Sequence, residues 1–370
     1  MLVGVPKEIK KQEARVGLTP AAAREYIAHG HSVMVETGAG AGIGANDDAY
    51  IAVGAEIAAS AADVFARAEM IVKVKEPQPQ EWVQLREGQI LFTYLHLAPD
   101  PDQAKGLLDS GVTSIAYETV TEGSGLPLLA PMSEVAGRLS IEAAAIASRN
   151  FNGGNGLLMG GVPGVAPARV LVLGGGVVGT QAARIAIGLG ADVSILDRSL
   201  PRLRQLDDLF AGRARTLFST IDSLEAELAH ADVVIGSVLI PGASAPKLVT
   251  KDMLGLMRRR SVIVDVAIDQ GGCFETSHAT THEQPTYEVD GVIHYCVANM
   301  PGCVPTTSSH ALNNATLPYG LALADGGLSA IMQNAGLRAG LSTHKGKLTS
   351  QPVAEALGMA FSSPAEAIAA

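Results

Sequence analysis

The sequence predicts an α/β protein with two doubly wound parallel-sheet domains, one inserted into the other. An apolar run at 170–173 leads into a glycine turn, a helical run and a second apolar run that ends at Asp197. Residues 1–128 also alternate strand and helix signals, but without such a turn. Helical patterns follow at 306–370 with no sign of a third sheet. We therefore expect 129–305 to be an insertion, with 306–370 packing back on 1–128.

The first segment begins with an apolar strand at 2–5. Thr19 and Pro20 predict an N-cap and a first-turn proline for a helix that runs to about residue 29. A strand at 32–37 precedes the glycine cluster 38–44. The acidic pair at 47–48 follows that cluster in place of an apolar helix, so we expect a loop there and no phosphate cradle.

A guanidinium, an ammonium and an imidazole group follow strands of this segment. Residues 70–76 alternate with period two, with Lys73 and Lys75 on one face, and Pro77 stops the strand. The strand at 90–96 ends at His96, and Arg15 lies in the loop after the first strand. Ligands of open parallel sheets bind beyond the carboxyl ends of the strands, so Arg15, Lys75 and His96 are predicted to form a site for a small anion.

Each of these side chains also has a structural interpretation. Arg15 could be a solvated charge, and Lys73 and Lys75 could lie on the exposed face of an edge strand. His96 could be a core histidine bonded to a backbone carbonyl. Their convergence on one predicted rim favours function.

The inserted domain begins with a helix predicted at 134–149, for which Ser133 is the expected N-cap. Asp269 follows the strand expected at 261–267 and should point into the ligand cleft. Residues 305–314 are uncharged and read as an interdomain crossing, not a core strand. The further strands are expected at 216–219, 231–239, 261–267 and 292–297, and the later helices at 317–335 and 352–357.

The run 170–197 has the features of a dinucleotide-binding βαβ unit. Gly174, Gly176 and Gly179 occupy the positions of G-x-G-x-x-G, which needs a tight turn, a bare backbone near a pyrophosphate and close helix packing. Phosphates are favoured at the N-terminus of the following helix. Asp197 is placed to accept hydrogen bonds from an adenosine ribose. A glycine turn without a nucleotide would leave this acid unexplained.

Composition limits the partners. A formal net charge of -10, with only the short basic run 258–260, argues against a nucleic-acid partner. The three cysteines show no C-x-x-C spacing, so neither a disulfide framework nor a metal site is expected. No signal peptide or membrane anchor is recognised, and 150–168 is broken by glycine and proline. We expect a cytoplasmic protein.

Several segments together resemble the family of alanine dehydrogenases and pyridine nucleotide transhydrogenases. The likeness covers nearly the whole chain, in order and at family spacing. The segments are 4–8 (GVPKE), 15–20 (RVGLTP), 73–77 (KVKEP), 92–96 (FTYLH), 129–138 (LAPMSEVAGR), 265–273 (DVAIDQGGC) and 297–301 (VANMP).

The resemblance implies NAD-dependent oxidative deamination of L-alanine to pyruvate and ammonium, reversible as reductive amination, in a homo-oligomer that is a hexamer or a dimer. Arg15 and Lys75 resemble the substrate contacts, His96 the proton donor and acceptor, and Asp269 its acidic partner. The residues that resemble the cofactor contacts are Ser133, Gly174, Gly176, Val177, Val178, Gly179, Asp197, Arg202, Ser219, Val238, Leu239, Val266, Ala267, Ile268, Asp269, Val297, Ala298, Asn299 and Met300.

Two positions depart from the family pattern. Arg198 directly follows the ribose-binding acid, where an arginine can favour a 2′-phosphate. His278 stands where an arginine is usual.

The chemistry supports the same roles. Hydride loss from an α-carbon needs a neutral amine, and histidine is the natural base near neutral pH. A carboxylate such as Asp269 can orient the water that attacks the imine, Lys75 can polarise the developing carbonyl, and Arg15 can hold the substrate carboxylate bidentately.

Three other functions fit parts of the sequence. The soluble nucleotide-binding subunit of a proton-translocating transhydrogenase shares the early Pro-Lys-Glu motif. An enzyme similar to saccharopine dehydrogenase would bind a larger amino acid. A catalytically silent NAD sensor would not need a proton relay.

Overall fold

The computed structural model describes residues 1–238 and 245–369. The chain divides into two compact units. Unit 1 comprises Met1–Met132 and Gly302–Ala370, and unit 2 comprises Ser133–Pro301. No helix within the described residues is long and apolar enough to cross a membrane.

Unit 1 contains an eight-stranded sheet in the order β15-β14-β6-β5-β4-β1-β2-β3. The strands β1 to β6 are parallel and follow the doubly wound order 3-2-1-4-5-6. The strands are β1 (Leu2–Val5), β2 (Ser32–Glu36), β3 (Glu56–Ala58), β4 (Met70–Val72), β5 (Ile90–Thr93), β6 (Thr113–Ala116), β14 (Leu341–His344) and β15 (Lys347–Leu348).

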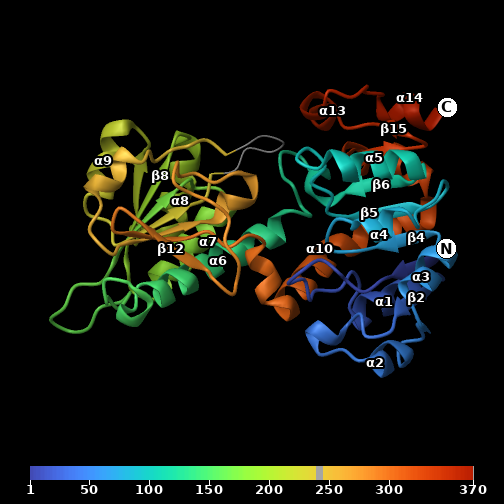
Figure 1. The fold of residues 1–370 in the computed structure, drawn as a ribbon, viewed down its shortest axis with the longest axis horizontal. Coiled ribbons are helices and arrows are strands. Elements are labelled where there is room, and N and C mark those ends of the chain that lie inside the picture. Colours follow the sequence, from blue (N-terminus) through green and yellow to red (C-terminus); the bar gives the residue numbers. More distant parts are fainter. Residues whose placement is uncertain (239–244, 370) are drawn as a thin grey trace. The chain divides into compact units, whose positions relative to one another are not determined.

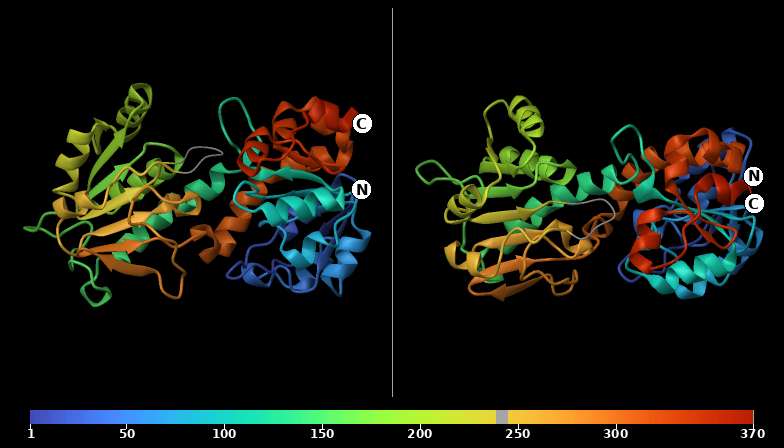
Figure 2. Two further views of the ribbon diagram at one scale, coloured as in Figure 1. Left: turned by 45° about the horizontal axis from the view of Figure 1, so that its top comes forward. Right: turned by 90° about the horizontal axis from the view of Figure 1, so that it is seen from above.

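Helices cover both faces of this sheet (Figures 1 and 2). Ala61, Val64, Phe65 and Trp82 pack with strand residues in one apolar core on one face. On α10, Gly320 lies against Tyr26 of α1 and Phe92 of β5. The helices are α1 (Pro20–Ala28), α2 (Asp47–Ile51), α3 (Ala61–Arg67), α4 (Pro79–Trp82), α5 (Pro101–Ser110), α10 (Pro305–Gly326), α11 (Leu328–Gln333), α12 (Ala335–Gly340), α13 (Gln351–Leu357) and α14 (Pro364–Ala369).

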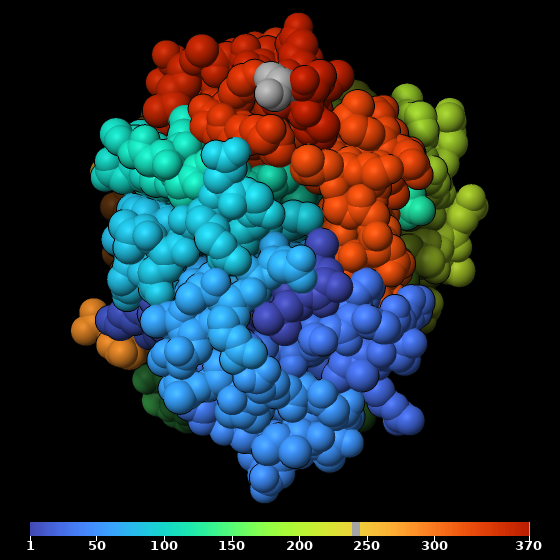
Figure 3. Space-filling view, turned by 90° about the vertical axis from the view of Figure 1, so that its right-hand side faces the viewer, coloured from blue at the N-terminus to red at the C-terminus, as the bar shows by residue number. Residues whose placement is uncertain are grey.

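The C-terminal segment completes unit 1. In the space-filling view, the C-terminal segment, in orange and red, forms one surface with the N-terminal segments of unit 1, in blue and cyan (Figure 3). It supplies β14, which pairs antiparallel with β6, and β15, which pairs antiparallel with β14. The sequence did not predict these short strands. The predicted parallel sheet therefore carries an antiparallel edge.

Unit 2 contains a seven-stranded sheet in the order β12-β13-β11-β10-β7-β8-β9, which repeats the order 3-2-1-4-5-6 and adds the antiparallel edge strand β12. Val170 and Val172 face one core, and Leu171 and Leu173 face the other, as the period of a strand requires. The elements are α6 (Ala130–Ala147), β7 (Arg169–Leu173), α7 (Val177–Gly188), β8 (Asp192–Asp197), α8 (Leu200–Phe210), β9 (Arg215–Phe218), α9 (Ile221–Leu228), β10 (Val233–Gly236), β11 (Val262–Asp265), β12 (Thr286–Val289) and β13 (Val292–Tyr295).

Two sequence-based predictions of local structure are wrong. Ser133 is not an N-cap, because α6 begins at Ala130 and places Pro131 in its first turn, where proline is tolerated. Residues 305–314, expected to be an interdomain crossing, instead form the N-terminal part of α10 within unit 1. In that helix Asn313 accepts a hydrogen bond from the backbone N–H of Thr19 and donates one to the carbonyl of Gly17. Such distant partners are invisible in a local sequence pattern.

Candidate active site

The predicted substrate residues follow three neighbouring strands of unit 1. The strands β5, β4 and β1 are adjacent and parallel. Arg15 lies on the loop after β1, Lys75 on the segment after β4, and His96 on the segment after β5. The topology therefore brings the predicted substrate residues to one edge of this sheet.

Arg15 is buried, with a relative exposure of 2%, so it is not a solvated charge. Its Nε donates to Glu13 Oε1 at 2.7 Å, and its Nη2 donates to Glu13 Oε2 at 2.5 Å. Its Nη1 contacts Met132 Sδ at 3.0 Å. Burial opposes the charged form, but the hydrogen bonds to Glu13 outweigh it and raise the pKa of Arg15. Glu13 therefore occupies the Nε–Nη2 edge of the guanidinium group.

The segment after β4 is not the predicted strand. β4 stops at Val72, and it is a central strand, not an edge strand. Lys73 is buried and bridges Glu8 Oε2 at 3.0 Å and Glu81 Oε1 at 2.8 Å. Glu8 Oε1 also accepts the N–H groups of Val74 at 2.6 Å and Lys75 at 3.4 Å. A carboxylate from the β1 loop thus takes two N–H groups beyond the end of β4, while the N–H of Lys73 still donates to the carbonyl of Phe92 in β5 at 3.2 Å.

Lys75 is also largely buried, with a relative exposure of 9%. Its Nζ lies 3.9 Å from Glu76 Oε2, and Glu76 accepts a short hydrogen bond from Lys10. Its carbonyl accepts from Thr93 Oγ1 at 3.0 Å, which ties it to β5. Lys75 is therefore a largely buried residue whose backbone is tied to β5, and not a surface lysine.

His96 is neither in a strand nor in the core. β5 ends at Thr93, and the side chain of His96 is 41% exposed. Its ring stacks on Tyr94, with centroids 5.8 Å apart and planes at 7°. Its backbone N–H donates to Glu118 Oε1 at 2.6 Å, and its φ of 49° lies in the left-handed region. The imidazole therefore projects from a tightly fixed backbone.

In unit 2 the glycine loop has the geometry of a dinucleotide turn. Gly174 has a φ of +98°, and a Cβ at Gly179 would lie 1.9 Å from the carbonyl of Gly174. A Cβ at Gly176 would meet no atom within 4 Å, and Gly176 is the N-cap of α7 without a side-chain cap. The loop thus leaves open space where the backbone of a helix N-terminus is exposed, which suits a pyrophosphate. Val177 and Val178 form the first turn of this helix.

Asp197 ends β8, as predicted, and organises the turn. Its Oδ2 accepts the N–H of Gly175 at 2.7 Å, its Oδ1 accepts that of Ser199 at 2.7 Å, and its carbonyl accepts that of Ser219 at 3.0 Å. Arg202 donates to the carbonyl of Gly175 at 2.6 Å and to Thr180 Oγ1 at 2.7 Å. Asp197, Arg202 and Ser219 therefore lie together around the glycine turn.

The segment after β11 carries Asp269 in a short 3-10 helix, η5 (Val266–Gln270), which also contains the predicted residues Ala267 and Ile268. Buried Asp265 holds this segment, since it accepts from the N–H of Ala267 at 3.2 Å and from that of Cys273 at 2.8 Å. Burial raises the pKa of Asp265 despite these bonds. Asp269 is exposed, and both its oxygens accept the N–H of Asn299, at 3.2 and 3.3 Å.

The remaining predicted cofactor residues lie in unit 2 as well. Val297, Ala298 and Asn299 follow β13, and Met300 begins a 3-10 helix at Met300–Cys303. Val238 follows β10, and its carbonyl accepts a weak hydrogen bond from Cys273 at 3.5 Å. Ser133 lies within α6. Leu239 lies outside the described residues.

The two departures from the family pattern have different surroundings. Arg198 is exposed beside Asp197. His278 stacks on Tyr287, with ring centroids 3.7 Å apart. This contact occupies one face of the His278 ring.

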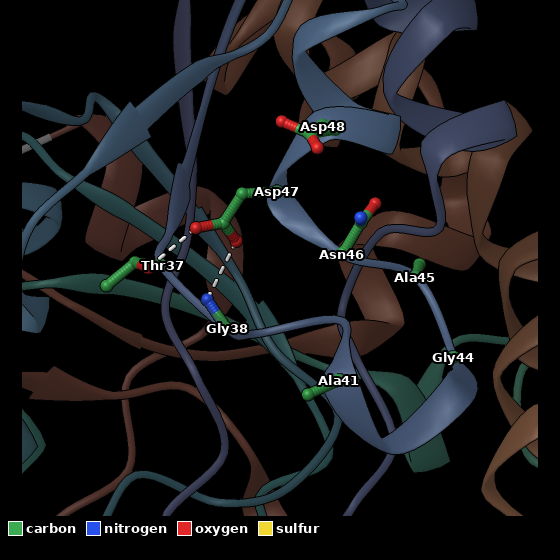
Figure 4. Close-up of a pocket in the computed structure, with 8 residues that line it drawn as sticks. All are labelled: Thr37, Gly38, Ala41, Gly44, Ala45, Asn46, Asp47 and Asp48. Carbon is green, nitrogen blue, oxygen red and sulfur yellow. Dashed lines mark hydrogen bonds between the residues drawn. The ribbon is translucent and has the colours of Figure 1, made fainter.

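The second glycine cluster shows no phosphate cradle. It forms a turn and a 3-10 helix at Ala41–Ile43, and the hollow beside it is drawn in Figure 4. Asp47 accepts hydrogen bonds from Thr37 Oγ1 at 2.6 Å and from the N–H of Gly38 at 2.8 Å. A protein carboxylate therefore takes the donors that a phosphate would need.

Sequence reasoning missed the carboxylates that contact Lys73, Arg15 and His96: Glu8, Glu13 and Glu118. Glu8 and Glu13 follow the predicted strand at 2–5, as many solvated acids do, and no strand was predicted before Glu118. Their partners were identifiable only from the strand order.

Comparison with known proteins agrees with this architecture. The family described as Alanine dehydrogenase/PNT, N-terminal domain, matches residues 4–136, and Alanine dehydrogenase/PNT, C-terminal domain, matches residues 140–351. The chain is 58% identical over 364 residues to alanine dehydrogenase of Halomonas elongata, with 98% of each chain covered. It is 55% identical over 363 residues to that of Bacillus subtilis, covering 98% of this chain and 96% of the relative.

Solved structures show the same likeness. An L-alanine dehydrogenase aligns with a TM-score of 0.94 at 50% identity, covering 97% of this chain and 99% of the other. A transhydrogenase from Sinorhizobium meliloti aligns with a TM-score of 0.81 at 27% identity, covering 95% and 99%.

The two doubly wound units, the glycine loop and these relatives define an oxidoreductase. The chain belongs to the alanine dehydrogenase/PNT family. Membership implies a nicotinamide cofactor and a small-molecule substrate.

Proposed function

We propose that the chain catalyses the NAD-dependent, reversible oxidative deamination of L-alanine to pyruvate and ammonium. The observation that carries this proposal is the full-length identity of 58% to a relative named alanine dehydrogenase. The cluster of Arg15, Lys75 and His96 at one sheet edge supports it, because a small amino acid needs a carboxylate contact, a carbonyl contact and a proton acceptor.

In this proposal unit 1 holds the substrate and unit 2 holds NAD. The fit of a dinucleotide rests on the open space at Gly176 and on Asp197, whose half-buried carboxylate suits a ribose. When bound, the nicotinamide supplies a hydride acceptor for the α-carbon. Arg202, Ser219, Val238 and the segments 266–269 and 297–300 would complete the cofactor contacts, together with Ser133 and Leu239.

The residues of the chain supply the remaining chemistry. Arg15 binds the substrate carboxylate, with the orientation of its guanidinium group fixed by Glu13. Lys75 donates to the oxygen that becomes the carbonyl. His96 takes a proton from the amine before hydride loss and releases it to solvent. It then takes a proton from the attacking water and passes it to the nitrogen, so that the C–N bond breaks, ammonia leaves with the hydroxyl proton as ammonium, and the carbonyl forms. Asp269 orients that water as it adds to the imine.

A set of spectrophotometric assays tests the proposal. The purified chain with NAD and L-alanine should produce NADH, and with pyruvate, ammonium and NADH it should consume NADH. Lysine with 2-oxoglutarate and NADH tests the saccharopine-type alternative, and hydride exchange between NADH and an NADP analogue tests the transhydrogenase alternative. NAD binding without turnover of any substrate would indicate a sensor and contradict the proposal.

We also propose that the chain forms a homo-oligomer, a hexamer or a dimer. Unit 2 exposes a run of apolar side chains on and after α6, where exposed apolar groups commonly mark interfaces. They are Ile146, Phe151, Leu158, Val162 and Val165, with relative exposures of 51 to 85%. Light scattering on the eluting protein measures the mass, and a monomer at assay concentration would exclude both assemblies.

A further inference from the structure

We propose that Glu118 is the positioning residue of His96, and that it acts on the backbone and on the ring of this histidine together. The proposal rests on the proposed role of His96 as the proton acceptor. It concerns a residue outside the predicted site, which the fold brings to His96 from the neighbouring strand.

The sheet places Glu118 beside His96. β5 and β6 are paired in parallel, with Thr93 opposite Ala116 as the last residues of the two strands. Two residues beyond Ala116 along the chain, Glu118 lies in the 3-10 helix η2 (Tyr117–Thr119). The segments that carry Glu118 and His96 therefore leave the same edge of the sheet side by side.

The carboxylate of Glu118 accepts two successive backbone N–H groups. Its Oε1 accepts that of His96 at 2.6 Å, and its two oxygens lie 3.3 and 3.2 Å from the N of Leu95. Hydrogen bonds to an ionised acceptor are stronger than neutral ones. These hydrogen bonds offset the conformational free-energy cost of the backbone at His96, since a φ of 49° is unfavourable for a residue with a Cβ.

The same carboxylate lies on one side of the imidazole ring. His96 Nδ1 is 3.9 Å from Glu118 Oε1, and the parallel ring of Tyr94 restricts rotation of the imidazole. Tyr94 is itself fixed, because its hydroxyl donates to the carbonyl of Leu128 at 2.5 Å. With Nδ1 facing a carboxylate, Nε2 is the nitrogen that exchanges protons with substrate. Carboxylates orient catalytic histidines in this way in hydrolases.

This geometry predicts a loss of turnover without a loss of cofactor binding. We expect Glu118→Ala to lower kcat about 100-fold, within the range of acid–base contributions, while the Kd of NADH changes less than about twofold. Glu118→Gln keeps an oxygen acceptor for the backbone but removes the charge, so its loss of kcat should be smaller than that of Glu118→Ala. Glu118→Asp should recover more activity than Glu118→Gln. Glu122→Ala, an exposed acid on the same segment, is the matched control and should keep wild-type turnover.

A double-variant cycle separates positioning from a general structural role. If Glu118 acts through His96, the variant lacking both side chains should be no slower than His96→Ala alone. Additive losses of kcat in the two single variants would overturn the inference. It would also be overturned if both Glu118→Gln and Glu118→Ala kept kcat within about twofold of the wild-type value. If Glu118→Ala does not fold, the same cycle is measured with Glu118→Gln. A His96→Ala variant with near-native turnover would instead contradict the proposed function of His96.

Discussion

Glu13 and Arg15 form a two-point ion pair inside unit 1, with side-chain exposures of 0 and 1%. An equivalent pair lies on the surface, where Arg67 donates to both oxygens of Glu56 at 2.6 and 2.9 Å and both side chains are 52% exposed. Both pairs join an arginine to a glutamate through two hydrogen bonds, and they differ in burial and in the edge of the guanidinium group that is used. They therefore allow a matched comparison of an ion pair in two environments.

We predict that Glu13→Gln lowers the free energy of unfolding by about 3 kcal/mol, because it leaves a buried guanidinium without its counter-charge. Glu56→Gln should have a much smaller effect, since water replaces the lost charge. Urea unfolding followed by circular dichroism measures both. Equal losses of unfolding free energy in the two variants would show that burial does not determine how much the Glu13–Arg15 pair contributes to stability.

The sequence predicts local units better than long-range ones. The predicted βαβ unit is confirmed as β7, α7 and β8, ending at Asp197, because its signals lie within one continuous segment. Thr19 is also confirmed as the N-cap of α1. The predicted strand at 70–76 is wrong beyond Val72, because Glu8, far away in sequence, takes the N–H groups that a longer strand would use.

The candidate site shows the same limit. Arg15, Lys75 and His96 were predicted as site residues because each follows a strand. The strand order places the ends of these strands at one edge of the unit 1 sheet. Nothing in a single sequence pairs Glu13 with Arg15 or Glu118 with His96, because such pairs depend on loop conformation and on which strands are neighbours. Their catalytic and binding roles remain predictions.

Substitutions at two glycines of the turn between β7 and α7 should affect NADH binding and protein stability separately. Gly176→Ala adds a methyl group to open space, so we expect normal stability but at least about 10-fold weaker NADH binding, since the pyrophosphate must approach this backbone. Gly179→Ala should destabilise the protein, because its Cβ would collide with the carbonyl of Gly174. NADH fluorescence titration and thermal unfolding measure the two properties.

Gly188→Ala is the control for both glycine variants. It lies in the same helix, α7, and its Cβ would also meet no atom within 4 Å. NADH binding should be unchanged, and stability should rise by up to about 1 kcal/mol, as alanine is the better helix former. Wild-type NADH affinity in Gly176→Ala would place the pyrophosphate elsewhere.

Asp197 and Arg198 should govern the choice between NAD and NADP in opposite directions. Asp197→Ser removes the carboxylate that would repel a 2′-phosphate, so the ratio of kcat/KM for NAD to that for NADP should fall at least about 10-fold. Arg198→Ala should lower the use of NADP and leave that of NAD nearly unchanged. Asp192→Ser, an exposed acid at the other end of β8, should not alter the ratio. An unchanged ratio in Asp197→Ser would exclude this carboxylate as the ribose contact.

Glu76 should make stability depend on acid pH. Burial opposes its ionised form, but Lys75 and Lys10 outweigh this and lower the pKa of Glu76 below its usual value. Its ionised carboxylate therefore stabilises the folded state fully above the unfolded pKa of 4.5, and this contribution is lost as the pH falls through the lowered folded value. The difference in unfolding free energy between wild type and Glu76→Gln should thus be constant from pH 7 to about pH 5.5 and shrink below pH 4.5.

Urea unfolding at a series of pH values measures this difference, and the other carboxylates titrate in both proteins and largely cancel. Glu25→Gln, on the exposed side of α1, serves as the control and should show little dependence on pH in this range. A difference for Glu76→Gln that grows on acidification would mean that burial, and not the two lysines, dominates at this carboxylate. The Lys10–Glu76–Lys75 arrangement would then not be a net stabilising contact in the folded protein.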